Sequence, residues 1–153
     1  MRIRDAKQPD APDLARLVNL AGSGMPLSYW THVDVQGDPW KVGEAAVRSD
    51  RGEFSYLNCR VAVDDAGVIA AGLNTFQMAS NIEAAGDVES WPPFAIPIQQ
   101  LERTCAGNWY VNFLATFEKY QGQGIASRLL QDVDRQATEA AVGIINLIVL
   151  GSK

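Results

Sequence analysis

The sequence predicts an α/β domain whose mixed, mostly antiparallel sheet ends in a strand–helix–strand crossover. Residues 56–76 form two alternating segments around a Gly-containing turn at residues 65–67, the pattern of a β-hairpin. Residues 109–117, 124–141 and 144–150 then have the patterns of a strand, a helix and a second strand. Such a crossover joins parallel strands with a right-handed connection, which makes the sheet mixed.

Length and composition indicate one domain over residues 1–153. The chain is 47% hydrophobic and 20% charged, which is typical of a globular protein that buries its own core. The N-terminus has no apolar leader segment and no apolar run is long enough to span a bilayer, so we expect a cytoplasmic protein without membrane contact. Cys59 and Cys105 lie far apart in apolar surroundings and are predicted to be reduced core residues.

The charge balance restricts the classes of partner. Eighteen acidic residues against 13 basic ones give a net charge of -5, which argues against nucleic acid as the main partner. It mildly favours a cationic small molecule. The His, Cys, Asp and Glu residues show no metal-ligand spacing, so we expect no metal site.

The N-terminal two-thirds combine short strands and helices with a long loop. The expected elements are a strand at residues 2–6, a helix that Asp10 caps and Gly22 ends, an aromatic-bearing loop at 25–30, a helix at 38–47, and a long binding loop or lid at 79–107.

Periodicity is clearest toward the C-terminus. Ile125, Leu129, Val133 and Ala137 are spaced by four and predict one buried face of a helix that Gly143 closes. Residues 144–150 are almost wholly apolar, as expected of a strand covered on both faces.

The turn before this helix has the features of a phosphate site. Residues 121–126 place two glycines where a strand gives way to a helix, so free main-chain N–H groups and the helix dipole can hold an anion. Glycine leaves room for a phosphate to approach the backbone. A P-loop would need Gly-Lys-Ser/Thr, and a dinucleotide fingerprint would need glycine at Ser127, so neither motif fits. A tight turn that only redirects the chain is the structural alternative.

The segment resembles the central motif of the GCN5-related N-acetyltransferase family, Arg/Gln-x-x-Gly-x-Gly/Ala, present here as Gln121-x-x-Gly124-x-Ala126. The preceding apolar strand and the following Leu-Leu helix also resemble that family. Residues 24–30, 38–40 and 54–56 look like a bacterial branch without an assigned substrate. The resemblance extends to residue 150 and implies an acyl-CoA N-acyltransferase-like fold.

By this resemblance the chain transfers acetyl from acetyl-CoA to an amine of a small molecule or peptide. The cofactor-binding residues would be Leu114, Ala115, Thr116, Gln121, Gly122, Gln123, Gly124, Ile125, Ala126 and Ser127. Main-chain amides of residues 121–126 would hold the pyrophosphate, the strand residues would pair with pantetheine, and the Leu114 N–H would polarise the thioester carbonyl. Gly124→Val is expected to block the pyrophosphate while leaving the fold largely intact.

Two departures from the family pattern concern the C-terminus and the proton-transfer groups. The family's Asn-x-x-Ala helix, its Tyr general acid and its last two strands have no counterpart before Lys153. An apolar strand left at a sheet edge predicts a homodimer or, failing that, a poorly soluble monomer. The general base and acid are unknown. Glu102 and Glu118 are candidates for the base, although the sequence favours solvated surface roles for both.

Aromatic residues are the candidates for an acceptor pocket, because aromatic faces attract cationic amines. Tyr29 and Trp30 are the first choice, with Trp40, Trp91 and Phe94 as further candidates and core packing as the alternative for each. His32 could line the same pocket, but an ordinary surface or packing role is favoured. Two other functions stay open: a catalytically incomplete CoA-binding or dimerising module, and a phosphate-binding regulatory domain.

Overall fold

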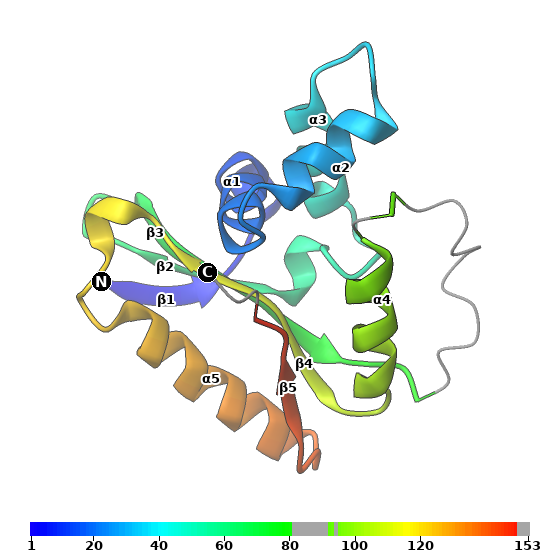
Figure 1. The fold of residues 1–153 in the computed structure, drawn as a ribbon. Coiled ribbons are helices and arrows are strands. Elements are labelled where there is room, and N and C mark those ends of the chain that lie inside the picture. Colours follow the sequence, from blue (N-terminus) through cyan, green and yellow to red (C-terminus); the bar gives the residue numbers. More distant parts are fainter. Residues whose placement is uncertain (81–91, 94, 150–153) are drawn as a thin grey trace.

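The computed structural model describes residues 1–80, 92–93 and 95–149 (Figure 1). Its strands are β1 (Arg2–Asp5), β2 (Cys59–Val63), β3 (Ile69–Gln77), β4 (Trp109–Thr116) and β5 (Ile145–Leu147). Its helices are α1 (Ala11–Ala21), α2 (Met25–Val33), α3 (Pro39–Arg48), α4 (Ile96–Glu102) and α5 (Ile125–Glu139). Short 3-10 turns lie at Gln8–Asp10, Tyr56–Asn58, Arg103–Cys105 and Glu118–Tyr120.

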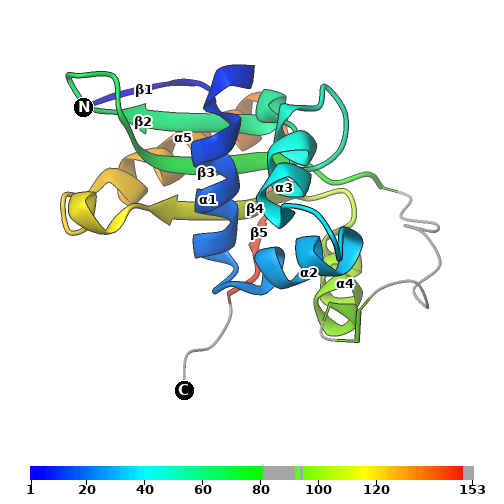
Figure 2. The ribbon, with the colours of Figure 1, turned by 90° about the horizontal axis from the view of Figure 1, so that it is seen from above.

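One five-stranded sheet organises the molecule in the order β1-β2-β3-β4-β5. The first four strands pair antiparallel, and β5 pairs parallel to β4, which confirms the predicted mixed sheet. Helices α1, α2 and α3 lie on one side of the sheet and α5 on the other, as Figures 1 and 2 show.

Apolar side chains spaced along α1 and α5 build the two layers of core. Leu14 and Leu17 of α1 are fully buried, and the close approach of α1 to β3 is possible because position 72 is glycine: an added Cβ there would lie 2.9 Å from Leu17 Cδ1. On the other face, Leu129 and Val133 of α5 are buried against β3 and β4. Full burial of each such side chain stabilises the folded state by roughly 1.5–3 kcal/mol. The helical spacing predicted for α5 is therefore confirmed.

The segment predicted as an aromatic loop at residues 25–30 is instead the start of α2, so that expectation was wrong. Gly24 precedes the helix with φ +88°, and Pro26 lies in its first turn. Trp30 is buried, and its ring packs directly over Gly43 of α3, where a Cβ would lie 2.6 Å from the ring. Burial of the indole between two helices outweighs the loop-like Gly-Met-Pro sequence.

The capping prediction for α1 was right about the start of the helix and wrong about the side chain. Asp10 occupies the N-cap position but makes no capping hydrogen bond. Its carboxylate accepts from both guanidinium nitrogens of Arg4, at 2.7 and 3.0 Å, and from the Lys7 N–H. Asp10 therefore ties β1 to the start of α1. In contrast, Asp38 caps α3 with its side chain, which accepts from the Trp40 N–H.

The predicted long loop at residues 79–107 contains a helix within its described part. Helix α4 begins at Ile96, with Pro97 in its first turn, where a missing N–H is tolerated. A 3-10 turn then brings the chain back to β4. Pro97 therefore starts a helix and does not mark a loop.

The C-terminal strand also differs from expectation. Strand β5 covers only Ile145–Leu147 and lies at the sheet edge, with Ile145 41% and Leu147 51% exposed. The expectation of a strand covered on both faces was therefore wrong. Helix α5 ends at Glu139, and just beyond it Ala141 takes φ +56° while the Val142 N–H donates to the Ala137 carbonyl. Ala141, rather than Gly143, supplies the left-handed residue of this helix end.

Candidate active site

The glycine turn between β4 and α5 is open and left-handed at two positions. Gly122 and Gly124 have φ values of +73° and +71°, and a Cβ added at either meets no heavy atom within 4 Å. Space for a ligand therefore exists beside both glycines. Gly124→Val would also strain the turn itself, because a β-branched residue is strongly disfavoured at this φ, so the variant would not test the pyrophosphate alone.

Main-chain donors at this turn are largely unpaired. The Gln121 N–H already donates to the Glu118 carbonyl, and the Gln121 side chain donates to the Thr116 carbonyl. For residues 122–127, no protein acceptor is found among the described residues for any main-chain N–H. These groups surround the N-terminus of the longest described helix, where the helix dipole adds positive potential. The turn thus has the chemistry of an anion site, with donors that begin at Gly122.

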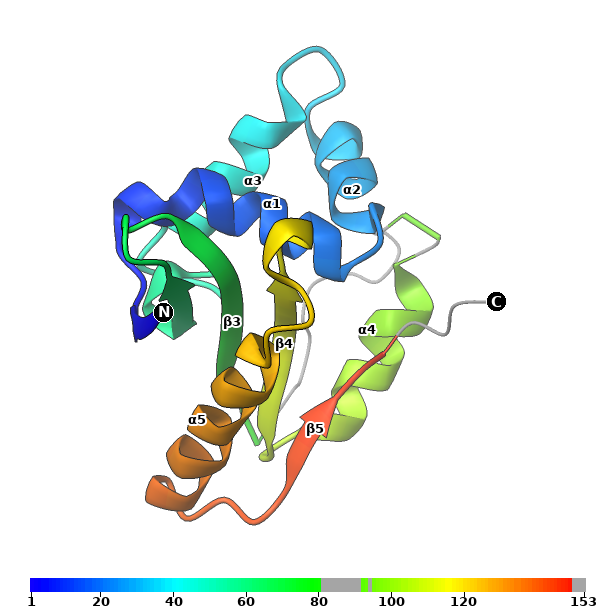
Figure 3. The same cartoon turned by 90° about the vertical axis from the view of Figure 1, so that its left-hand side faces the viewer.

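The edge of β4 continues this surface toward the middle of the sheet. Strand β5 pairs only with residues 109–111 of β4, and Figure 3 shows the two strands separating beyond that point. The Phe117 N–H donates to Ala70 of β3, so alternate N–H groups at 115 and 113 face β3. The Leu114 N–H consequently points to the opposite, open side, between β4 and β5.

A bulge at Asn112 produces this direction. Phe113 pairs with Asn74 and Val111 pairs with Thr75, which leaves Asn112 as an extra residue on β4. The extra residue shifts by one the order in which successive main-chain N–H groups point toward β3 and away from it. The side-chain amide nitrogen of Asn112 is buried and has no hydrogen-bond partner among the described residues. A ligand oxygen could accept a hydrogen bond from this amide nitrogen.

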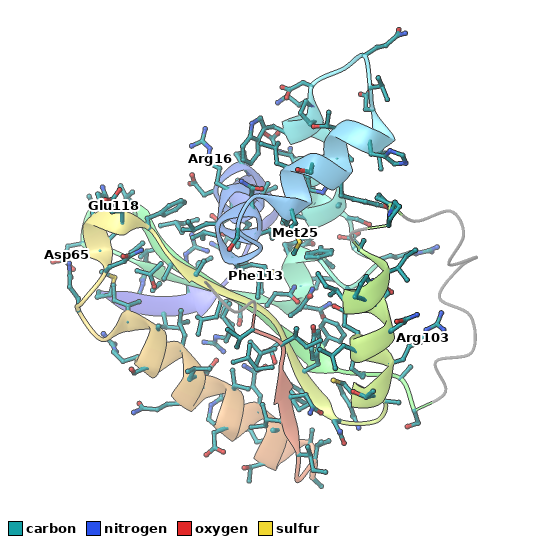
Figure 4. The ribbon with its side chains drawn as sticks, in the orientation of Figure 1. Arg16, Met25, Asp65, Arg103, Phe113 and Glu118 are labelled. Atoms are coloured by element: carbon teal, nitrogen blue, oxygen red, sulfur yellow. The ribbon has the colours of Figure 1, made fainter. Side chains whose placement is uncertain are left out.

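A cavity of about 590 Å³ lies beside this part of β4. Leu114 lines its wall together with Tyr29 and Trp30, so the structure brings the predicted thioester and acceptor candidates to one place. In Figure 4, Met25 of α2 and Phe113 of β4 lie toward this region, while Glu118 is at the far end of the sheet. Other lining residues include Val18, Ala21, Pro26, Val33, Val42, Ala46, Phe54, Ala95, Ile98, Asn112, Ile148 and Val149.

Glu102 places a carboxylate in this mostly apolar wall. Its Oε1 accepts from the Tyr110 hydroxyl at 3.0 Å, and its Oε2 accepts from the Gln99 side chain at 3.0 Å. Burial raises the pKa of Glu102, the Tyr110 hydrogen bond opposes this shift, and the negative charge of Glu53 adds to it. The pKa of Tyr110 is raised as well, by burial and by the Glu102 charge. The solvated surface role that the sequence favoured for Glu102 is therefore wrong.

Glu53 is the second carboxylate at the cavity, and the sequence analysis did not identify it. The residue as a whole is exposed, yet loss of solvent around its carboxyl group raises its pKa. Its main-chain carbonyl accepts from the side-chain amides of Asn74, at 3.0 Å, and Asn58, at 3.3 Å. These bonds hold the segment before β2 against the bulged part of the sheet.

Several other candidates lie elsewhere. Trp40 packs on Trp30 with ring centroids 5.8 Å apart and supports the cavity wall from behind without lining it. His32 and Glu118 are exposed and do not line the cavity. Trp91 and Phe94 lie outside the described residues. The described part of the chain has no group of His, Cys, Asp and Glu residues able to hold a metal ion.

Both cysteines are buried free thiols, as predicted. Burial raises the pKa of Cys59 to about 12, and a hydrogen bond from Asn74 only partly opposes this. Neither thiol lines the cavity. Cysteine nucleophilic chemistry is therefore not part of this site.

The family model for the acetyltransferase (GNAT) family matches residues 39–152. The chain belongs to this family. Members of this family transfer an acetyl group from acetyl-CoA to an amine. Its membership identifies the chain as an N-acetyltransferase. No curated protein matches the sequence significantly.

Solved structures of acetyltransferases share the fold at low identity. One described only as an acetyltransferase has a TM-score of 0.64 and 19% identity, over 96% of this chain and 79% of that one. An N-acetyltransferase from Staphylococcus aureus Mu50 has a TM-score of 0.61 and 18% identity, over 90% and 77%. A GNAT acetyltransferase from Brucella melitensis, solved with acetyl-CoA, has a TM-score of 0.54 and 17% identity, over 99% and 76%. Among the described helices, none has the length and hydrophobicity needed to cross a bilayer.

Proposed function

We propose that this acetyltransferase acetylates an amine of a small molecule or peptide bound in the cavity, with Glu102 as the general base. The observation that supports this most directly is the shared wall: the Leu114 edge of β4 and the Glu102 carboxylate border one space. An acyl donor along β4 and an amine in the cavity would meet there.

The acyl donor would bind along the open edge of β4 and the turn that follows. N–H groups of residues 122–127 would hold the pyrophosphate of acetyl-CoA, with the Ser127 hydroxyl in the same first helical turn. Residues 114–116 would pair with the pantetheine arm through their main chain. The Leu114 N–H would donate to the thioester oxygen as negative charge develops on it.

Glu102 would accept the proton that the amine must lose. The neutral amine nitrogen attacks the thioester carbon, so that a C–N bond forms and the C–S bond breaks. The nitrogen then gives its second proton to water, and the sulfur leaves as thiolate that takes one proton from water. Net, one ammonium and acetyl-CoA give an amide, free CoA and one proton. A carboxylate with a raised pKa is a stronger base than an exposed one, and Tyr110 and Gln99 hold it in place.

Two measurements test the proposal. Saturating acetyl-CoA should raise the melting temperature, corresponding to about 2.7 kcal/mol at a concentration 100 times the dissociation constant. Free thiol should appear when an amine panel is added. We expect Glu102→Gln to lower kcat/KM about 10²-fold or more, while the matched variant Glu118→Gln, in an exposed turn, stays close to the parent.

The outcomes separate the alternatives. No thermal shift with acetyl-CoA would contradict the proposal and leave a phosphate-binding domain of another kind. A shift without thiol release from any amine would identify a CoA-binding module instead. Equal loss of activity in both variants would remove Glu102 from the base role.

A further inference from the structure

The cavity has a charge pattern that concerns the amine substrate. Its only charged lining residues, among those that the structure describes, are Glu53 and Glu102. The rest of the wall is mostly apolar, with Trp30 and Tyr29 as aromatic surfaces. No described lysine or arginine forms an ion pair with either carboxylate.

The two carboxylates act on each other through this space. The charge of Glu53 is close enough to raise the pKa of Glu102, and the apolar wall screens their repulsion poorly. Arg103, the residue next to Glu102, points outward from α4 in Figure 4 and does not line the cavity. A carboxylate brought in by a substrate would therefore be the third in this space, and it would meet two negative charges and no described cation in the wall.

Glu53 is held where it can exert this effect. Its main-chain carbonyl is bound by Asn74, a fully buried residue on β3 opposite the β4 bulge. Glu102 is already engaged by Tyr110 and Gln99, whereas the Glu53 carboxylate has no hydrogen-bond donor among the described residues. A substrate ammonium would supply the missing positive partner.

We infer that the acceptor is a cationic amine on an apolar or aromatic body without a carboxylate, and that Glu53 selects against amines that carry one. The inference rests on the proposed function and narrows its substrate class. Free amino acids are disfavoured by the charge of their carboxylate. Amino-acid amides, arylalkylamines and apolar peptide N-termini share the favoured chemistry. Glu53 is thus a specificity-determining residue that leaves the proton transfer to Glu102.

Three matched amines test this at saturating acetyl-CoA. Phenylalaninamide and phenylalanine have nearly equal size and differ in one negative charge, and glycinamide lacks the apolar body. We expect kcat/KM for phenylalaninamide to exceed that for phenylalanine by about tenfold or more beyond the difference in their neutral amine fractions. Phenylalaninamide should also exceed glycinamide by about tenfold, as expected for burial of an aromatic ring.

Glu53→Gln should reduce the phenylalaninamide-to-phenylalanine ratio at least about threefold. Dividing the parent's phenylalaninamide-to-phenylalanine ratio of kcat/KM by that of the variant cancels the different pKa values of the two amines. The thermal shift with acetyl-CoA should be unchanged in this variant. Glu139→Gln, the same substitution at an exposed position at the end of α5, serves as control and should leave the ratio as in the parent.

Each result has a separate meaning. The inference is overturned if the parent uses phenylalanine or glycinamide as well as phenylalaninamide. It is also overturned if Glu53→Gln leaves the phenylalaninamide-to-phenylalanine ratio of kcat/KM unchanged. In both cases the transferase assignment stands. If acetyl-CoA binds and no amine of any class is acetylated, the proposed function fails, and the substrate class fails with it.

Discussion

At the scale of single residues, Glu102 shows how a site group can work against stability. Its carboxylate lies in a mostly apolar wall, where two hydrogen bonds compensate only part of the lost hydration. Asn112 is comparable, since its buried amide nitrogen has no described partner. Both groups are costly in the free protein, and a bound substrate can satisfy both.

Glu102→Gln is expected to stabilise the folded protein at neutral and alkaline pH while it lowers activity. The pKa of Glu102 is raised on folding, so its ionised form favours the unfolded state, and stability is lost as pH rises through the folded pKa. Thermal melts across pH should show the variant and the parent converging below about pH 4, the range of an unfolded glutamic acid. The amide of Gln99 can rotate to face the new side chain. A variant that is less stable than the parent at high pH would contradict this account.

At the scale of elements, the N-terminus of α5 carries the proposed diphosphate site. Ile125 and Leu129 anchor the helix to the sheet, and the opposite face of its first turn is exposed around Ser127. The left-handed glycines direct the chain into the helix without covering its donors. The element is therefore fixed on one side and open on the other.

Ser127→Glu should separate helix stability from cofactor binding. A negative charge in the first turn favours the helix by roughly 0.3–1 kcal/mol, and the same charge repels a diphosphate. We expect a slightly higher melting temperature without ligand and about tenfold weaker binding of acetyl-CoA by calorimetry. Gln131→Glu, exposed further along α5, should bind within about twofold of the parent, because the effect of the dipole is confined to the first turn. Tight binding by Ser127→Glu would place the phosphates elsewhere.

At the scale of the whole molecule, the β5 edge of the sheet is open and apolar. Strand β5 is short and apolar, and its outer edge has no pairing strand among the described residues. Ile145 and Leu147 are exposed there. Because unpaired edges with apolar side chains associate, we propose that two copies of the chain pair at this end of the sheet.

Ile145→Lys should convert a dimer into a monomer. A lysine on an edge strand opposes pairing with another chain through its charge and its hydration. Light scattering at micromolar concentration should report a dimer for the parent and a monomer for the variant. Leu130→Lys, which places the same charge at an exposed leucine of α5, should remain dimeric. A monomeric parent would end the proposal.

Local repetition in the sequence was sufficient for much of the fold. The four-residue spacing of Ile125, Leu129, Val133 and Ala137 determined the buried face of α5, and the alternation on either side of Gly67 determined the hairpin. Both signals depend on the backbone period of one element, which neighbouring residues encode directly. The glycine turn before α5 is local in the same sense.

The tertiary structure alone decided which distant groups share the cavity. Glu53, Glu102 and Leu114 come from three separate segments, the loop after α3, the end of α4 and the middle of β4, and no spacing along the chain indicates that they meet. The same holds for Trp30, which was predicted in a loop and is packed between two helices. It also holds for β5, whose apolar sequence predicted cover on both faces although the fold leaves the strand at an exposed edge. Proximity across a fold depends on how layers pack, and desolvation follows from that packing, so the raised pKa of Glu102 could not be deduced from the sequence.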